Sequence, residues 1–171
     1  MTTIMALAFI LLAADASWTP VDDVVMDGGS TSRAVPTENA TLLFVGDVSL
    51  ENNSGFASIR TAPQQHDLSG TEGIVLRVRG DGKRYRLIVR TDARFDGVWY
   101  QAGFTTLDGE WQDVRIAFAQ FEPRFRGRPV PDAPPLDRAR IRSFGLLIAD
   151  RQAGPFRLEI DTVRSRAVDP P

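Results

Sequence analysis

The sequence predicts a single all-β domain folded as a jelly-roll β-sandwich. Its 171 residues are enough for one domain. Apolar and polar residues alternate along much of the chain, as they do in half-buried strands, and helical periodicity is hard to find after residue 18. Turn-forming residues separate these segments at intervals of roughly 8–12 residues, which is typical of a sandwich.

Eight segments carry the alternating or continuously apolar pattern of strands. Residues 84–90 place Tyr85, Leu87 and Val89 on one face and arginines on the other. Residues 144–149 are apolar throughout, which predicts a central strand covered on both faces. The expected strands span residues 41–45, 56–60, 74–79, 84–90, 98–106, 111–118, 144–149 and 156–163.

Residues 80–83 separate two of these strands with the sequence Gly-Asp-Gly-Lys. Glycine supplies the positive φ of a tight turn, so residues 74–79 and 84–90 are expected to form a β-hairpin. Its polar face would carry five arginines, available to an anion or acidic partner or simply solvated and paired with aspartates. These are Arg77, Arg79, Arg84, Arg86 and Arg90.

The first 17 residues form a separate apolar segment. Residues 4–14 are apolar without a break, which is too short to span a bilayer. The following Ala14-Asp15-Ala16 fits a signal-peptide cleavage site, whereas the lack of Lys or Arg in residues 1–3 favours a first strand of the domain. We expect the sandwich to cover residues 18–165 and a short tail to follow at residues 166–171.

Composition argues against several function classes. The chain has no cysteine, one histidine (His66) and a net charge of −2. Thiol catalysis, disulfides and cysteine or two-histidine metal sites are therefore excluded within one chain, and nucleic-acid binding is disfavoured. His66 is expected at the surface, and no phosphate-binding glycine motif is present. We expect no catalytic residue, no metal and no cofactor.

Residues 120–137 contain five prolines, a density that a central strand does not tolerate. We expect a long ordered loop or an edge crossover, which either contacts a partner or covers one end of the sandwich. Arginine together with an aromatic ring is a common composition of interface hot spots. This combination occurs at Arg124, Phe125, Arg126 and Arg128.

Two polar motifs stand out upstream. Asp22 and Asp23 are adjacent carboxylates that could brace the amides of the following loop, contact a partner or bind a divalent cation. Asn52 and Asn53 precede Phe56 in a stretch that suits a plain turn, a protein contact or a sugar face.

In their order, several motifs resemble the complex I intermediate-associated protein 30 family from about Trp18 to Val163. One departure is Asp27, which stands where the family pattern has glycine; aspartate tolerates the left-handed conformation better than most residues. The resemblance is carried by Val21-Asp22-Asp23-Val24-Val25-Met26, Gly28, Ser30, Ser32-Arg33, Leu50-Glu51-Asn52-Asn53, Gly55-Phe56-Ala57-Ser58-Ile59-Arg60, Asp67-Leu68-Ser69-Gly70, Gly145-Leu146-Leu147-Ile148-Ala149-Asp150 and Gly154-Pro155-Phe156.

This resemblance implies a galactose-binding-like sandwich and a non-enzymatic assembly factor for respiratory complex I. Its partners would be protein subunits of a membrane-arm intermediate, and its location cytoplasmic or peripheral to the inner membrane, or else exported through a signal peptide. Oligomeric state is left open. The candidate partner-binding residues are Asp22, Asp23, Met26, Gly28, Ser30, Ser32, Arg33, Asn52, Asn53, Phe56, Arg124, Phe125, Arg126 and Arg128.

The alternative function is that of a carbohydrate-binding module on the same fold. It requires exposed aromatic rings on one face or loop end, for which Phe56, Trp99 and Tyr100 are the candidates.

Overall fold

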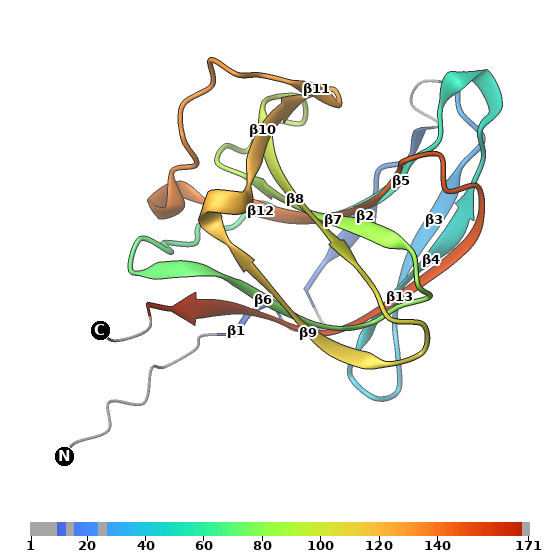
Figure 1. Ribbon diagram of the computed structural model, residues 1–171, viewed down its shortest axis with the longest axis horizontal. Coiled ribbons are helices and arrows are strands. Elements are labelled where there is room, and N and C mark those ends of the chain that lie inside the picture. The colour runs from blue at the N-terminus through green and yellow to red at the C-terminus, as the bar shows by residue number, and fades with distance from the viewer. Residues whose placement is uncertain (1–9, 13–15, 24–26, 169–171) are drawn as a thin grey trace.

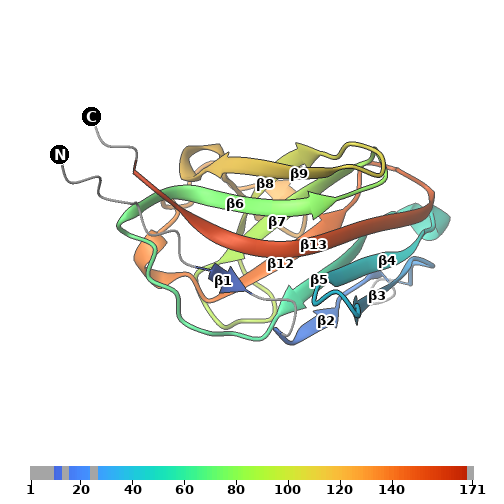
Figure 2. The same ribbon diagram turned by 90° about the horizontal axis from the view of Figure 1, so that it is seen from below.

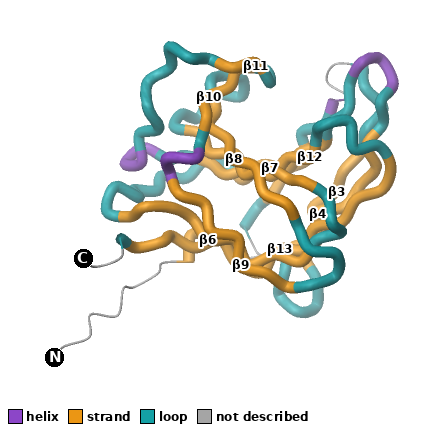
Figure 3. The backbone as a smooth tube through the Cα atoms, viewed as in Figure 1, coloured by secondary structure: helices purple, strands orange, loops and turns teal. Residues whose placement is uncertain are grey.

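The computed structural model describes residues 10–12, 16–23 and 27–168, and these form a sandwich of two antiparallel sheets (Figures 1 and 2). The described residues contain strands and short 3-10 helices but no α-helix, so the predicted all-β sandwich is confirmed. The 3-10 helices are confined to connections between strands (Figure 3): η2 (Glu51–Asn53), η3 (Phe118–Gln120) and η4 (Arg138–Arg140).

The first sheet contains six strands. They are β1 (Ile10–Leu12), β3 (Thr31–Pro36), β4 (Leu42–Val48), β6 (Thr71–Arg79), β9 (Trp111–Ala117) and β13 (Gly154–Ala167). The order is β3-β4-β13-β6-β9, and β1 pairs with β13 through Ile10 opposite Arg164. The long strand β13 therefore joins β4 to β6 (Figure 2).

The second sheet contains seven strands. They are β2 (Trp18–Pro20), β5 (Ala57–Thr61), β7 (Arg84–Arg90), β8 (Trp99–Thr105), β10 (Glu122–Phe125), β11 (Arg128–Pro129) and β12 (Ser143–Ile148). The order is β11-β10-β8-β7-β12-β5-β2. β12 lies in the middle and is buried along its whole length, as its continuously apolar sequence predicts.

The core lies between the two sheets and is built from alternate residues of each strand. Phe44 and Phe156 come from the first sheet and Tyr85 and Phe104 from the second. The rings of Phe44 and Phe156 pack edge to face with centroids 4.8 Å apart, and Tyr85 stacks on Phe104 at 6.1 Å. Because the main strands of both sheets give one face to this core, alternation is strong along them.

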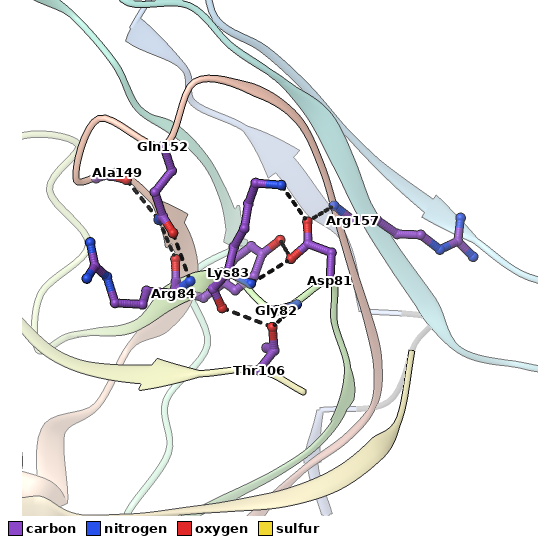
Figure 4. Close-up of polar contacts among 9 residues, drawn as sticks. Asp81, Gly82, Lys83, Arg84, Thr106, Ala149, Gln152 and Arg157 are labelled. Carbon is purple, nitrogen blue, oxygen red and sulfur yellow. Dashed lines mark hydrogen bonds and ion pairs between the residues drawn. The ribbon is translucent and has the colours of Figure 1, made fainter. Parts of the chain in front are cut away.

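The expected hairpin at residues 80–83 is wrong. β6 lies in the first sheet and β7 in the second, so the turn carries the chain from one sheet to the other. Asp81 fixes it by accepting from the Arg157 amide at 2.9 Å and the Tyr85 hydroxyl at 3.0 Å (Figure 4). The connection from β8 to β9 changes sheet beside it, where Thr106 Oγ1 donates to the Lys83 carbonyl at 2.9 Å.

The arginine face expected on that hairpin is therefore also wrong. Arg77 and Arg79 lie on the outer surface of the first sheet, where both guanidinium groups approach the Trp111 ring. Arg84 and Arg86 lie on the second sheet and pair with Asp150, while Arg90 is buried. The five arginines occupy opposite faces of the sandwich.

Four strands were not predicted: β2, β3, β10 and β11. Two of them lie in the proline-rich segment, which forms the edge of the seven-stranded sheet instead of a wholly irregular loop. Pro129 is tolerated because the edge strand β11 leaves one side of its backbone unpaired, and Pro123 precedes the two residues of β10 that pair with β11. The expected edge position is therefore correct, although part of the segment is regular.

Gly80 tests the packing of the two sheet-changing turns. A Cβ atom added to Gly80 would lie 2.3 Å from Thr106 Cβ, whereas one added to Gly70 meets no atom within 4 Å. We expect Gly80→Ala to lower the free energy of unfolding by about 1–3 kcal/mol and Gly70→Ala to change it by less than about 0.5 kcal/mol. Urea unfolding followed by tryptophan fluorescence measures both; equal losses would contradict this packing.

Candidate partner-binding surface

Asp23 is the buried centre of the first candidate loop. Its carboxylate accepts four hydrogen bonds: from the amide and hydroxyl of Ser30 at 2.9 and 2.6 Å, and from the amides of Gly55 and Phe56 at 3.0 and 3.2 Å. Burial alone would raise the pKa of Asp23, but these hydrogen bonds outweigh it and hold the pKa below its ordinary value. The carboxylate thus ties the segment before β3 to the segment before β5.

Asp22 repeats this arrangement one residue earlier. Its Oδ1 accepts from the Ser32 hydroxyl at 2.6 Å and from the Ser58 amide at 3.0 Å. The Ser58 hydroxyl donates in turn to the Val21 carbonyl. The adjacent carboxylates therefore reach to both β3 and β5, which belong to different sheets.

The loop backbone fits closely around these carboxylates. A Cβ at Gly28 would lie 2.3 Å from Asp23 Oδ1, so any larger residue would displace the carboxylate. Asp27 has a φ of 61°, the left-handed conformation that the glycine of the family pattern would supply. Asn52, itself at a φ of 56°, donates its Nδ2 to the Asp27 carbonyl at 2.7 Å. The two motif loops thus form one unit.

Burial divides the candidate residues of this unit into two groups. Asp23 and Ser30 are completely buried, so in this structure they shape the loops from beneath and offer no surface to a partner. Ser32 is also buried, Asp22, Gly28 and Phe56 are half-buried, and Met26 lies outside the described residues. The exposed members are Arg33, Asn52 and Asn53.

The third candidate segment lies at the opposite edge of the seven-stranded sheet. Arg124 and Phe125 end β10, Arg126 occupies the turn with a φ of 48°, and Arg128 begins β11. Arg126 pairs with Asp96, and Arg124 donates to Glu122 at 2.7 Å. Phe125, Arg126 and Arg128 are exposed. Three strands of the sheet, β8, β7 and β12, lie between this arm and β5, which adjoins the unit around Asp23.

Metal ligands and His66 are the groups for chemistry that the sequence raises. No cluster of three or more acidic or histidine side chains there could hold a metal ion. His66 is half-buried against Phe144, 5.2 Å between ring centroids, instead of lying at the surface as expected; burial lowers its pKa. Within the same ranges, no helix is long and apolar enough to cross a membrane.

Tyr100 is unavailable to the sugar-binding alternative. It is 4% exposed, and its hydroxyl donates to the Pro134 carbonyl at 2.7 Å, so the ring is part of the core. Trp99 and Phe56 keep partial exposure but lie apart: Trp99 begins β8, and Phe56 precedes β5, with β7 and β12 between those two strands.

Replacing Asp23 tests its bracing role. We expect Asp23→Asn to lower the free energy of unfolding by about 3 kcal/mol, because the amide loses one acceptor oxygen and turns an NH2 group toward buried donors. The carboxylate has a lowered pKa, so its contribution is present at neutral pH and lost as the pH falls through that pKa. The gap between wild type and variant should narrow in acid.

The matched control for this prediction is Asp27→Asn. Asp27 is exposed and its left-handed backbone also suits asparagine, so the change should stay within about 0.5 kcal/mol. Urea unfolding at pH 7 and at pH 2 measures both variants, because the contribution of Asp23 is lost only below the ordinary carboxyl pKa. Equal losses at neutral pH would contradict the assignment of Asp23.

Comparison with solved structures confirms the jelly-roll sandwich. The family 11 carbohydrate-binding module of Clostridium thermocellum superposes with a TM-score of 0.69, at 16% identity, over 94% of this chain and 96% of the module. A family 30 carbohydrate-binding module gives 0.56 at 14% identity, over 95% and 99%. At such identity the likeness speaks for the fold alone.

Sequence relatives carry a more specific likeness. Complex I intermediate-associated protein 30, mitochondrial, of Drosophila melanogaster is 29% identical over 168 residues, which cover 85% of this chain and 57% of the fly protein. The protein of that name from Mus musculus is 34% identical over 102 residues, covering 57% and 31%. This chain spans about half the length of such relatives. Since residues 9–160 match the family as a whole, the chain belongs to the complex I intermediate-associated protein 30 (CIA30) family.

Proposed function

We propose that this chain is a non-enzymatic protein-binding domain that associates with assembly intermediates of respiratory complex I. The observation that carries this proposal is the family match over residues 9–160. The relatives named for association with complex I intermediates cover most of this chain. The arrangement of the two motif loops adds to it, because they present exposed polar side chains on a braced frame.

The contact surface in this proposal is the exposed part of the braced unit, with Arg33, Asn52 and Asn53 at its centre. Asp23 and Asp22 hold the backbone of that unit from beneath. A surface held in this way loses little conformational entropy on binding, which favours affinity. The arm with Phe125 and Arg126 is a second contact at the other edge of the sheet.

The mechanism in this proposal is transient shielding. The domain covers a surface of a membrane subunit until the next subunit docks, and it leaves because its affinity for the finished enzyme is lower. A hundredfold preference for the intermediate needs only about 2.7 kcal/mol of differential binding free energy. In this proposal the domain acts at the periphery of the inner membrane, beside the membrane subunits that it binds.

Affinity capture tests this function. The tagged full chain, crosslinked in its own host and purified in mild detergent, should enrich membrane-arm subunits of complex I without the complete enzyme. Mass spectrometry identifies the partners. Capture of no respiratory subunit would overturn the proposed function and leave only the family membership and the fold.

A charge reversal locates the contact surface. We expect Arg33→Glu to reduce capture roughly tenfold, since a central contact residue is worth more than about 1.4 kcal/mol. Arg115→Glu is the matched control: Arg115 is also exposed but lies on β9, at the opposite edge of the same sheet from β3, which carries Arg33. Quantitative mass spectrometry compares the two. Equal capture by both variants would remove the unit around Asp23 from the interface.

A further inference from the structure

The outer face of the seven-stranded sheet brings Arg60 and Arg90 together across β12. In the strand register, Arg60 lies opposite Gly145 and Arg90 lies opposite Ser143. Ser143 and Gly145 are two residues apart on one strand, so they share a face, and the two arginines flank it on either side. Neither arginine belongs to the contact surface proposed above.

Arg90 is buried without the partners that a buried cation requires. It is 5% exposed, and its Nε and Nη1 find no hydrogen-bond partner among the residues that the structure describes. The guanidinium carbon lies 5.1 Å from the centre of the Trp99 ring. Burying a charged group without hydrogen bonds costs free energy, so a ligand that supplied acceptors would offset a cost already present in the fold.

Arg60 opens this cluster to solvent. It lines a cleft of about 240 Å³ together with Thr19, Ser143, Asp92 and Phe95. Its guanidinium carbon lies 5.2 Å from the centre of the Phe95 ring, and Nη1 donates to the Phe95 carbonyl at 3.2 Å. The cleft therefore has one arginine in its wall and, beside Ser143, the second arginine behind it.

The electrostatics of the cluster favour an anion. Burial first, and then the nearby Arg60 cation, lower the pKa of Arg90 to about 10, so both groups are cationic at neutral pH. Asp92 and Asp96 act in the opposite direction, but neither forms an ion pair with Arg90 within the described ranges. Arg60 therefore adds a second positive charge near Arg90, and no acidic side chain of the described residues forms an ion pair with Arg90.

The chemistry of the cluster selects a carboxylate. Aromatic rings approach the guanidinium groups of both arginines, and the N–H edge of a guanidinium matches the planar fork of a carboxylate. Asp92 lines the same cleft and would repel the second charge of a phosphate dianion. Gly145 adds no side chain between the arginines, and the Ile88 side chain packs beside it, with Cβ 3.4 Å from where a Cβ of residue 145 would lie.

The surroundings indicate a peptide as the carrier of that carboxylate. Phe95 is 67% exposed beside the cleft and offers an apolar contact to a neighbouring side chain. Figure 1 shows β10 and β11 rising at one edge of this sheet and the segment before β5 rising at the other. An extended segment that contacted both edges would cross the outer face that carries Arg60 and Arg90.

We infer that Arg60 and Arg90 form a carboxylate-binding site that takes an acidic side chain of an extended client segment. The identity of the client as a complex I subunit rests on the proposed function; the site itself does not. The site would therefore select for an acidic side chain in the client, between the contacts made by the unit around Asp23 and by the arm with Phe125 and Arg126.

The test uses the full chain labelled with nitrogen-15 and a blocked tripeptide with a central glutamate between two leucines. We expect this probe to shift the side-chain Nε–H signals of Arg60 and Arg90, and the same peptide with glutamine not to. Arg60→Gln and Arg90→Gln should weaken the titrated affinity at least tenfold. Arg77→Gln, which removes an arginine beside Trp111 on the opposite face, should leave it unchanged.

Stability provides a second measurement for Arg90. Since its buried charge lacks partners, Arg90→Met should unfold at the same or a higher urea concentration than wild type while losing the probe. A clear loss of stability would assign Arg90 a structural role and overturn the site. If the Arg90 variants do not fold, the affinity of Arg60→Gln for the glutamate peptide still tests the site, and an unchanged affinity would overturn it.

Other probes complete the set of outcomes. No shift with the glutamate peptide would overturn the site. Tighter binding of inorganic phosphate than of the peptide would contradict a carboxylate as the ligand. Equal affinity for glucuronate and the peptide would contradict a peptide as the carrier and indicate a sugar acid. Peptide binding together with failed capture of respiratory subunits would keep the site and reject the proposed client.

Discussion

The carboxylate of Asp23 is the interaction on which the N-terminal part of the sandwich depends. The chain passes there from β2 in one sheet to β3 in the other, and a connection between sheets has no ladder to fix it. Asp23 replaces that ladder with four hydrogen bonds to groups from two distant segments. A buried carboxylate is stable only when its oxygens accept hydrogen bonds in this way. Movement of either loop would break some of these bonds and leave the buried charge unsatisfied, so each loop restrains the other.

Most strands could be predicted because alternation records which residues face the core. Alternation does not record which sheet a strand belongs to, since Tyr85 of one sheet and Phe44 of the other face the same core. The hairpin expected at residues 80–83 failed for this reason: its glycines are typical of a tight turn whether the chain returns within one sheet or crosses to the next. The hydrogen bond from the Arg157 amide to Asp81 fixes the turn that crosses between the sheets, and these two residues are 76 positions apart in the sequence.

The motif residues of the candidate surface were found through the family resemblance, but their roles required the structure. Asp23 and Arg33 belong to one motif, yet one is buried beneath the loop and the other exposed on it. β2 and β3 were missed because they are short and half-exposed, so their alternation is weak. Arg60 was present in a recognised motif and Arg90 in a predicted strand, but their proximity depends on β12 lying between them.

Asp23 and Arg90 show how the same physical requirement separates a structural charge from a binding charge. Both are buried ions, and each needs partners to offset the loss of water. Asp23 accepts its hydrogen bonds from donors within the fold, so its carboxylate stabilises the two loops and is not available to a ligand. Arg90 has a buried edge with no acceptor in the described structure and a second cation beside it. An unpartnered buried guanidinium edge lowers the stability of the fold. A ligand that supplies the missing acceptor removes this penalty, and the free energy regained contributes to its affinity. The unit around Asp23 and the site around Arg90 are therefore complementary: the first gives the domain a fixed shape, and the second gives it a preference for charge.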